Sequence, residues 1–126
     1  MNVDPAQIEG AARVLACGEL VGMPTETVYG LAADAANPEA VARVFAVKGR
    51  PQFNPLISHV ADLKMAMREG QFDGRALALA EAFWPGPLTL VVPVAETGQS
   101  SELARAGLST IGLRVPRHPI AQAVLR

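Results

Sequence analysis

Apolar residues recur at helical spacing in five segments of the chain. In the clearest case Val41, Val44 and Phe45 fall at i, i+3 and i+4, and Lys48 follows at i+7 over the same face. A capping Asn-Pro pair opens this segment, and glycine and proline stop it. The five predicted helices run from the Asp4 cap to Gly18, from the Asn37 cap to Gly49, from the Asp62 cap to about Arg68, from Asp73 to Phe83 and from His118 to Arg126.

Four short apolar runs lie between these helices and predict strands. They cover residues 20–23, 55–60, 88–92 and 110–115, and we expect the first two to be buried. Residues 24–37 are expected to form a loop, and residues 95–108 a mobile polar loop. The Trp-Pro-Gly-Pro sequence at 84–87 predicts a rigid turn. Helices and strands together indicate an α/β domain.

The composition limits the classes of protein that the chain can represent. A length of 126 residues fits one domain, and an apolar share of 50% is enough for a core. The formal charge of -1 argues against a nucleic-acid coat or a polybasic membrane patch. No apolar run reaches the roughly 18 residues of a membrane helix, and the N-terminus lacks a secretory pattern. We therefore expect a cytoplasmic domain, away from membranes, that handles a small molecule.

Two cations flank a glycine where the second predicted helix ends. Lys48 and Arg50 stand on either side of Gly49, just before Pro51. A lysine supplies a compact charge and an arginine a planar fork, and both suit phosphate groups. The same residues would also stabilise a helix C-terminus through the helix dipole. Spacing alone favours this second interpretation.

The segment at 24–30 follows a predicted strand, where α/β folds commonly place ligands. The hydroxyl groups of Thr25, Thr27 and Tyr29 could orient a polar substrate. The alternative is a turn in which these side chains satisfy their own backbone. The residues do not decide between the two interpretations.

Three isolated residues complete the candidate chemistry. His59 lies in an apolar run, where a histidine more often has a structural role. Arg114 lies within a buried strand and needs a partner, which either Glu26 or a ligand carboxylate could supply. The single cysteine, Cys17, excludes a disulfide framework and is expected to be buried. We find no Walker, dinucleotide-binding or multi-ligand metal pattern, and assign no metal ligand in the chain.

Four segments, taken together and in order, resemble the YrdC-like family, whose best-known members are threonylcarbamoyl-AMP synthases. Each segment alone would be a weak signal, but their order and spacing both agree with the family. The resemblance extends from about Gly10 to Arg126. The segments are Gly-Met-Pro-Thr-Glu-Thr-Val-Tyr-Gly-Leu at 22–31, Lys-Gly-Arg-Pro at 48–51 with Asn-Pro-Leu at 54–56, Phe-Trp-Pro-Gly-Pro-Leu-Thr at 83–89, and Ile-Gly-Leu-Arg-Val-Pro at 111–116 with His-Pro at 118–119.

This resemblance implies a twisted, mixed β-sheet with helices and a concave, basic cavity. It also implies a nucleotidyltransferase that converts L-threonine, bicarbonate and ATP, with Mg2+, into threonylcarbamoyl-AMP and pyrophosphate. The product would serve the N6-threonylcarbamoyladenosine modification of tRNA, through a downstream threonylcarbamoyl-transferase complex. The family's L-threonine contacts would fall on Thr27, His59 and Arg114. Its ATP contacts would fall on Arg50, Asn54 and Thr110, and Lys48 would join Arg50 beside the phosphates as the catalytic pair.

The chain departs from the family pattern in one respect. Family members carry a Ser-x-Asn motif further along, and this sequence has none. We therefore expect residues 1–126 to be the N-terminal two thirds of a single YrdC-like domain, an incomplete domain that lacks part of its cavity wall. The alternative function is a YrdC-like module that binds double-stranded RNA or nucleotide without synthase activity. The related domain of hydrogenase maturation proteins is disfavoured, because those proteins carry additional zinc-binding cysteines.

Overall fold

The computed structural model of the chain describes residues 4–51 and 53–126. Its helices confirm the five expected from the sequence: α1 (Pro5–Ala16), α2 (Pro38–Lys48), α3 (Leu63–Glu69), α4 (Gly74–Phe83) and α5 (Pro119–Leu125). Asp62 and Asp73 each accept a first-turn N–H at 2.8 Å, as capping residues do. Gly49 ends α2 with φ of 63°, a left-handed conformation that favours glycine. Within the described residues, no helix is both long and apolar enough to cross a membrane.

The strands include one that the apolar pattern does not reveal. They are β1 (Val21–Pro24), β2 (Tyr29–Ala32), β3 (Ile57–His59), β4 (Leu90–Pro93) and β5 (Thr110–Arg114). The expectation of a loop over residues 24–37 is therefore wrong, because β2 pairs antiparallel with β1. The first two residues of β2 are exposed, so no apolar alternation marks it. The run at 55–60 is also not wholly buried, since Ile57 is 48% exposed.

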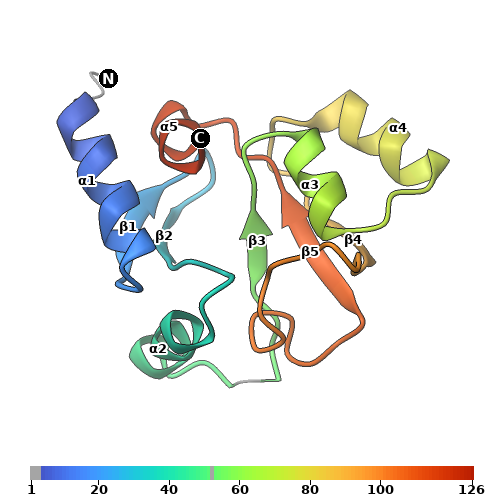
Figure 1. Cartoon of the computed structure of the whole chain (residues 1–126). Helices are drawn as coiled ribbons and strands as arrows, with labels where there is room; N and C mark the ends of the chain where they lie inside the picture. The colour runs from blue at the N-terminus through green and yellow to red at the C-terminus, as the bar shows by residue number, and fades with distance from the viewer. Residues whose placement is uncertain (1–3, 52) are drawn as a thin grey trace.

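The described strands form two sheets (Figure 1). The β1–β2 hairpin is one, and the other has the order β3-β5-β4. In the second sheet β3 runs parallel to β5 and β4 runs antiparallel to it, which confirms the expected mixed pairing. Helices α1 and α5 pack against the hairpin through a small apolar cluster that includes Met23 and Val124. The expected single sheet is thus interrupted between β2 and β3.

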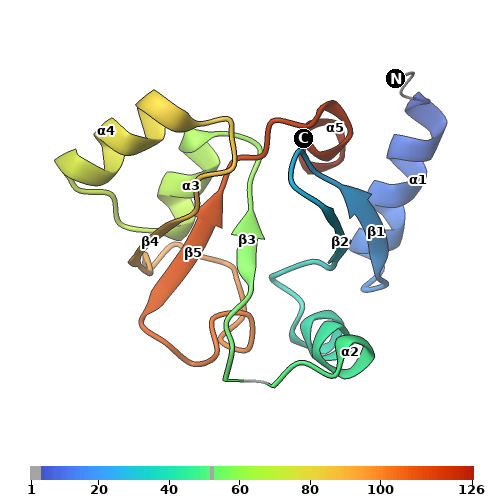
Figure 2. The same cartoon turned by 180° about the vertical axis from the view of Figure 1, so that it is seen from behind.

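One face of the three-stranded sheet is covered and the other is open. Ile111 and Leu113 of β5 are buried in the main core, against apolar residues of α3 and α4. Side chains alternate along a strand, so the intervening residues face the other way. On that second face Ile57, Gly112 and Val91 lie side by side in the register, and Val91 is 69% exposed. In Figure 2 the sheet is seen from this side, with α3 behind β5 and α4 beside the sheet.

The segment at 95–108 has no strand, as expected, but hydrogen bonds and apolar packing connect it to the rest of the molecule. The carboxylate of Glu69 accepts the N–H groups of Gln99 and Ser100 at 2.8 and 3.2 Å. Ala104 is buried against α2 in a cluster with Phe45. Cys17, in contrast, is exposed at the C-cap of α1, so the expectation of a buried cysteine is wrong.

Replacing Gly70 by alanine should lower the free energy of unfolding by about 1–3 kcal/mol, because the core is overpacked. A Cβ at this position would clash with Cγ2 of Val92 and lie 3.0 Å from Cδ1 of Leu113. Gly10 is the matched control, because its Cβ would meet nothing within 4 Å inside α1. Gly10→Ala should therefore raise the free energy of unfolding by about 0.5–1 kcal/mol. Urea denaturation measures both, and equal effects of the two substitutions would contradict this packing.

Candidate active site

The seven candidate residues fall into two groups at opposite ends of β3 and β5. His59 and Arg114 are the last residues of their strands, and Thr110 is the first residue of β5. A rise of about 3.3 Å per residue separates the ends of β5 by roughly 13 Å. Ligands that touch both groups must therefore extend along the strands. The group at the carboxyl ends is Thr27, His59 and Arg114, and the group at the amino ends is Lys48, Arg50, Asn54 and Thr110.

Arg114 is the centre of the first group. Its side chain is only 7% exposed, and Nη2 lies 2.7 Å from Oε1 of Glu26. Nε donates to the carbonyl of Gly86 at 3.1 Å, and Nη1 donates to Oγ1 of Thr27 at 3.3 Å. Of the two partners left open by the sequence, Glu26 supplies the counter-charge. At 2.7 Å the Glu26 carboxylate is in direct contact with Nη2, so the pair of opposite charges is formed within the protein itself.

Glu26 links the β1–β2 turn to the connection between β5 and α5. Its Oε2 accepts the backbone N–H of Arg117 at 2.8 Å. Burial alone would raise the pKa of Glu26, but backbone N–H groups and the Arg114 charge outweigh burial. The pKa of Glu26 is consequently held below its ordinary value of 4.5, and the side chain is ionised at neutral pH. The Arg117 guanidinium turns to the carbonyl of Pro85.

The hydroxyl groups of the turn have a defined direction. Oγ1 of Thr25 donates to the carbonyl of Val28 at 2.8 Å, and Thr25 Oγ1 lies 2.9 Å from Oγ1 of Thr27. Because Thr25 has one hydroxyl proton, the Thr27 hydroxyl donates to it. Thr27 Oγ1 thus presents only lone pairs, one of which takes the N–H of Arg114. Thr25 satisfies the backbone of its own turn, as the second interpretation expects. The role of these hydroxyl groups in orienting a substrate stays a prediction.

His59 lies directly opposite Arg114 in the parallel pairing of β3 and β5. Burial lowers its pKa below the ordinary value of 6.5, and the nearby positive charge of Arg114 lowers it further. The backbone of Ile57 and the charge of Glu26 act in the opposite direction but do not overcome these causes. Nε2 is buried and has no partner among the described residues. A neutral imidazole is therefore left with one buried atom for a ligand to satisfy.

This lowered pKa predicts a loss of stability on mild acidification. As the pH falls below 6.5, the unfolded chain takes up a proton at His59 before the folded chain does. The free energy of unfolding should therefore fall between about pH 7.5 and about pH 5.5, and His59→Gln should reduce that fall. Urea midpoints at the two pH values measure it. An equal fall in the variant and the unmodified chain would contradict a buried, neutral His59.

The second group is organised by Arg50. Its Nε donates to the carbonyl of Asn54 at 3.3 Å, and its Nη2 donates to the carbonyl of Pro55 at 2.8 Å. These bonds hold the segment before β3 in a tight turn. Lys48 is exposed at the end of α2, on the side of that helix's buried residues. Thr110 pairs with Pro93 across β4 and β5, and among the described residues it forms no side-chain hydrogen bond or ion pair with the other three.

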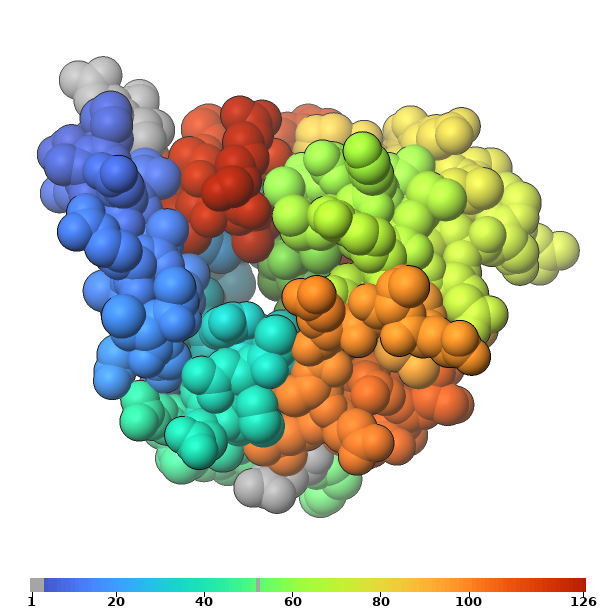
Figure 3. Space-filling model, in the orientation of Figure 1, coloured from blue at the N-terminus to red at the C-terminus, as the bar shows by residue number. Residues whose placement is uncertain are grey.

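A cavity of about 590 Å³ opens between the hairpin and β3. Figure 3 shows the hollow among α1, α5, α3, α2 and the 95–108 segment. Lys48, Arg50 and His59 line it, whereas Thr27, Asn54, Thr110 and Arg114 do not. Asp34 and Glu69 also line it, so the charges of Lys48 and Arg50 are balanced. Most of the remaining lining is apolar, and the basic cavity that the resemblance implies stays a prediction.

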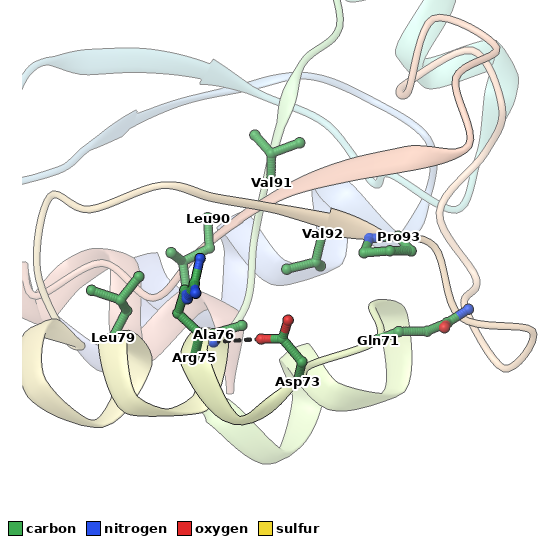
Figure 4. A pocket seen from close by; sticks show the side chains of 9 residues that line it. All are labelled: Gln71, Asp73, Arg75, Ala76, Leu79, Leu90, Val91, Val92 and Pro93. Carbon is green, nitrogen blue, oxygen red and sulfur yellow. Dashed lines mark hydrogen bonds between the residues drawn. The ribbon is translucent and has the colours of Figure 1, made fainter.

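A second hollow, of about 240 Å³, lies between β4 and α4 (Figure 4). None of the seven candidate residues lines it. Its one carboxylate, Asp73, already accepts the N–H of Ala76 as the cap of α4. Within the described residues, no three His, Cys, Asp or Glu side chains gather as a metal site. The candidate binding and catalytic residues therefore lie around β3 and β5 and not in this second hollow.

Three groups that shape the site gave little or no signal in the sequence. The Gly86 carbonyl and the Arg117 N–H hold Arg114 and Glu26 in place, and only the turn around Gly86 was recognisable. A side chain on this glycine would lie 2.5 Å from the Phe83 carbonyl, so the tight turn excludes one. Ser100 lines the large cavity with a buried hydroxyl that has no partner among the described residues. Backbone partners and loop hydroxyls have no characteristic spacing.

Known proteins of one group are similar to almost the whole chain. A family model described as Sua5, YciO and YrdC (telomere recombination) matches residues 13–126. The threonylcarbamoyl-AMP synthase of Bacillus subtilis is 42% identical over 127 residues, which are 100% of this chain and 36% of that protein. The threonylcarbamoyl-AMP synthase of Halorhodospira halophila is 36% identical and is matched over 95% of this chain and 62% of that protein.

Solved structures extend the similarity to the fold. Sua5 of Pyrococcus abyssi, determined with L-threonine, superposes with a TM-score of 0.93 at 42% identity. That match covers 98% of this chain and 36% of the Sua5 chain. YciO of Escherichia coli superposes with a TM-score of 0.87 at 26% identity, over 98% of this chain and 60% of its own. The chain thus spans between about a third and about three fifths of the length of these four relatives.

Proposed function

Because the chain belongs to the Sua5, YciO and YrdC family, we propose that its protein is an L-threonylcarbamoyladenylate synthase. This nucleotidyltransferase would join L-threonine, bicarbonate and ATP into threonylcarbamoyl-AMP and pyrophosphate. The relatives named threonylcarbamoyl-AMP synthase support this assignment. The chain would contribute the substrate-binding residues, and the complete reaction belongs to the full-length protein.

The observation that carries the proposal is the meeting of Arg114, Thr27 and His59 at the carboxyl ends of β3 and β5. Nε2 of His59 is buried without a partner in the described residues, and only one of the two Nη1 N–H groups of Arg114 is taken up, by Thr27. A ligand carboxylate would accept from Arg114 in a charge-assisted pair. The lone pairs of Thr27 Oγ1 and a neutral His59 suit the amine or hydroxyl of the same ligand. L-Threonine offers all three groups, and the Sua5 of P. abyssi was solved with it.

The nucleotide would lie toward the amino ends of the same strands. Lys48 and Arg50 lie on either side of Gly49 at the end of α2. Asn54 lies just before β3, and Thr110 is the first residue of β5. In the described part of the chain Lys48 forms no ion pair, so its ammonium is free for a phosphate. Asn54 and Thr110 offer polar groups for the rest of the nucleotide. The open sheet face connects this end to the L-threonine end.

The proposed reaction needs positioning rather than a protein nucleophile. The L-threonine amine bonds to the carbon of bicarbonate, and water leaves as the N-carboxy form appears. An oxygen of that carbamate then attacks the α-phosphorus of ATP, the bond to the β-phosphate oxygen breaks, and pyrophosphate leaves. Lys48 and Arg50 would stabilise the charge that grows on the phosphates. Arg114 would hold the second anionic reactant at the other end of the sheet.

The described residues do not provide a protein cage for Mg2+, since no carboxylate cluster is present among them. A magnesium ion is commonly held by the phosphates of its nucleotide and by few protein groups. We therefore propose that Mg2+ enters as part of the ATP complex. The steps assigned to the chain do not pass through it.

We further propose that residues 1–126 form the N-terminal two thirds of a single domain. The coverage of 62% of the H. halophila synthase and 60% of YciO supports this extent. An apolar cavity between two strand edges also suits a domain whose remaining segment would fill it. The product would pass to a tRNA threonylcarbamoyl-transferase complex, which implies a cytoplasmic role.

Pyrophosphate release by the full-length protein tests the proposed function. We expect release from Mg·ATP only when L-threonine and bicarbonate are both present. Release that does not depend on L-threonine would contradict the proposal. Binding of double-stranded RNA with no pyrophosphate release would favour the alternative of a binding module.

A further inference from the structure

The contact between Glu26 and Arg114 places a carboxylate directly beside the proposed ligand position. The ion pair joins Nη2 of Arg114 to Oε1 of Glu26 at 2.7 Å. One Nη1 proton goes to Thr27 and the Nε proton goes to Gly86. Because Nη2 is already in contact with the Glu26 carboxylate, a ligand carboxylate on Arg114 would share Nη2 with Glu26 or use the second N–H of Nη1.

Glu26 is held where it cannot easily withdraw from the ligand position. Its second oxygen accepts the Arg117 N–H at 2.8 Å, across the gap between the hairpin turn and the start of α5. Figures 1 and 2 show the β5–α5 connection passing beside this turn. The Glu26 side chain is 22% exposed, so its charge is only partly screened by water. A ligand carboxylate on Arg114 would consequently meet a second, fixed carboxylate.

We propose that Glu26 sets the charge selectivity of the L-threonine site, so that the site accepts a zwitterionic amino acid and disfavours a simple carboxylate anion. Arg114 and Glu26 together are neutral, and His59 is uncharged. A ligand of net charge zero matches this environment, because its ammonium group offsets the repulsion between the two carboxylates. A carboxylate that lacks the ammonium group receives no such compensation. Glu26 is thus a specificity-determining residue, and the inference rests on the proposed function.

The test compares L-threonine with (R)-3-hydroxybutyrate, the same molecule without its amino group. Titration calorimetry of the chain should show that L-threonine binds at least about tenfold more tightly. In Glu26→Gln, the affinity for (R)-3-hydroxybutyrate should rise and the preference should fall by about tenfold. Glutamine keeps an acceptor for the Arg117 N–H, so the turn should persist. Glu26→Asp, which keeps the charge, should retain most of the preference.

Two comparisons separate charge matching from other causes. Glu81→Gln removes an equal charge from exposed α4 and should leave the preference unchanged. An unchanged preference in Glu26→Gln, or an equal shift in Glu81→Gln, would overturn the proposal. Equal affinity of the unmodified chain for both ligands would overturn it without any variant. Failure of the unmodified chain to bind L-threonine at all would instead contradict the proposed site itself.

Discussion

Replacing Arg114 by alanine should reduce L-threonine affinity by about a hundredfold or more, while Mg·ATP affinity changes by less than about threefold. The truncation removes the guanidinium that ends β5 and contacts both Glu26 and Thr27. Titration calorimetry with each ligand measures the two affinities. Equal losses for both ligands would contradict the division of the site into two ends.

The same substitution should also destabilise the fold. Glu26 would lose its counter-charge, and because its own side chain is 22% exposed, the cost should stay below the ~3–5 kcal/mol of breaking a wholly buried pair. The double variant Arg114→Met with Glu26→Gln removes both charges and should recover much of that stability. Its L-threonine affinity should stay low, which separates binding from folding. Arg114→Lys keeps the charge but not the fork, and should bind L-threonine about tenfold more weakly than the unmodified chain.

Replacing Lys48 by alanine should produce the opposite pattern, with Mg·ATP affinity reduced by about tenfold or more and L-threonine affinity unchanged. Lys48 is exposed and forms no ion pair in the described residues, so stability should change by less than about 0.5 kcal/mol. Lys64→Ala on α3 is the matched control, since it removes the same charge outside the cavity lining. An equal ATP effect in the two variants would contradict a phosphate role for Lys48.

Arg50→Ala should lower both ATP affinity and stability. Its guanidinium already donates to the carbonyls of Asn54 and Pro55, and these bonds hold the turn before β3. Loss of these two charge-assisted hydrogen bonds should lower the free energy of unfolding by at most about 2–4 kcal/mol, because exposure to solvent weakens them. The comparison of Lys48 with Arg50 therefore separates a phosphate contact from a contact that also shapes the loop.

The sequence predicts the helices well because their signals are local. Capping residues such as Asn37 and Asp73 and the apolar spacing of α2 lie within a few residues of the features they determine. β2 lacks such a signal because its first two residues are exposed. It is a strand through its pairing with β1, and no pattern within its own residues indicates this. The interruption between β2 and β3 likewise depends on the arrangement of whole elements. Local pattern therefore predicts element types better than sheet organisation.

In the candidate site, too, some features follow from the sequence and others depend on the folded structure. The family resemblance predicts seven side chains, and the structure gathers three of them at one end of the strands. Whether Glu26 or a ligand pairs with Arg114 could not be predicted from spacing, because the turn meets β5 across 87 positions of sequence. The direction of the Thr25 and Thr27 hydroxyl bonds depends on the Val28 carbonyl, which every residue type carries. Such backbone contacts require the folded structure.

The central claim is that one sheet face binds L-threonine and ATP together at opposite ends of β3 and β5. The most direct test is titration of the chain with Mg·ATP, with and without saturating L-threonine. We predict that ATP binds and that L-threonine strengthens its binding, because the two ligands complete adjoining parts of one site. ATP affinity that is the same with and without L-threonine, or a folded chain that binds neither ligand, would contradict the claim.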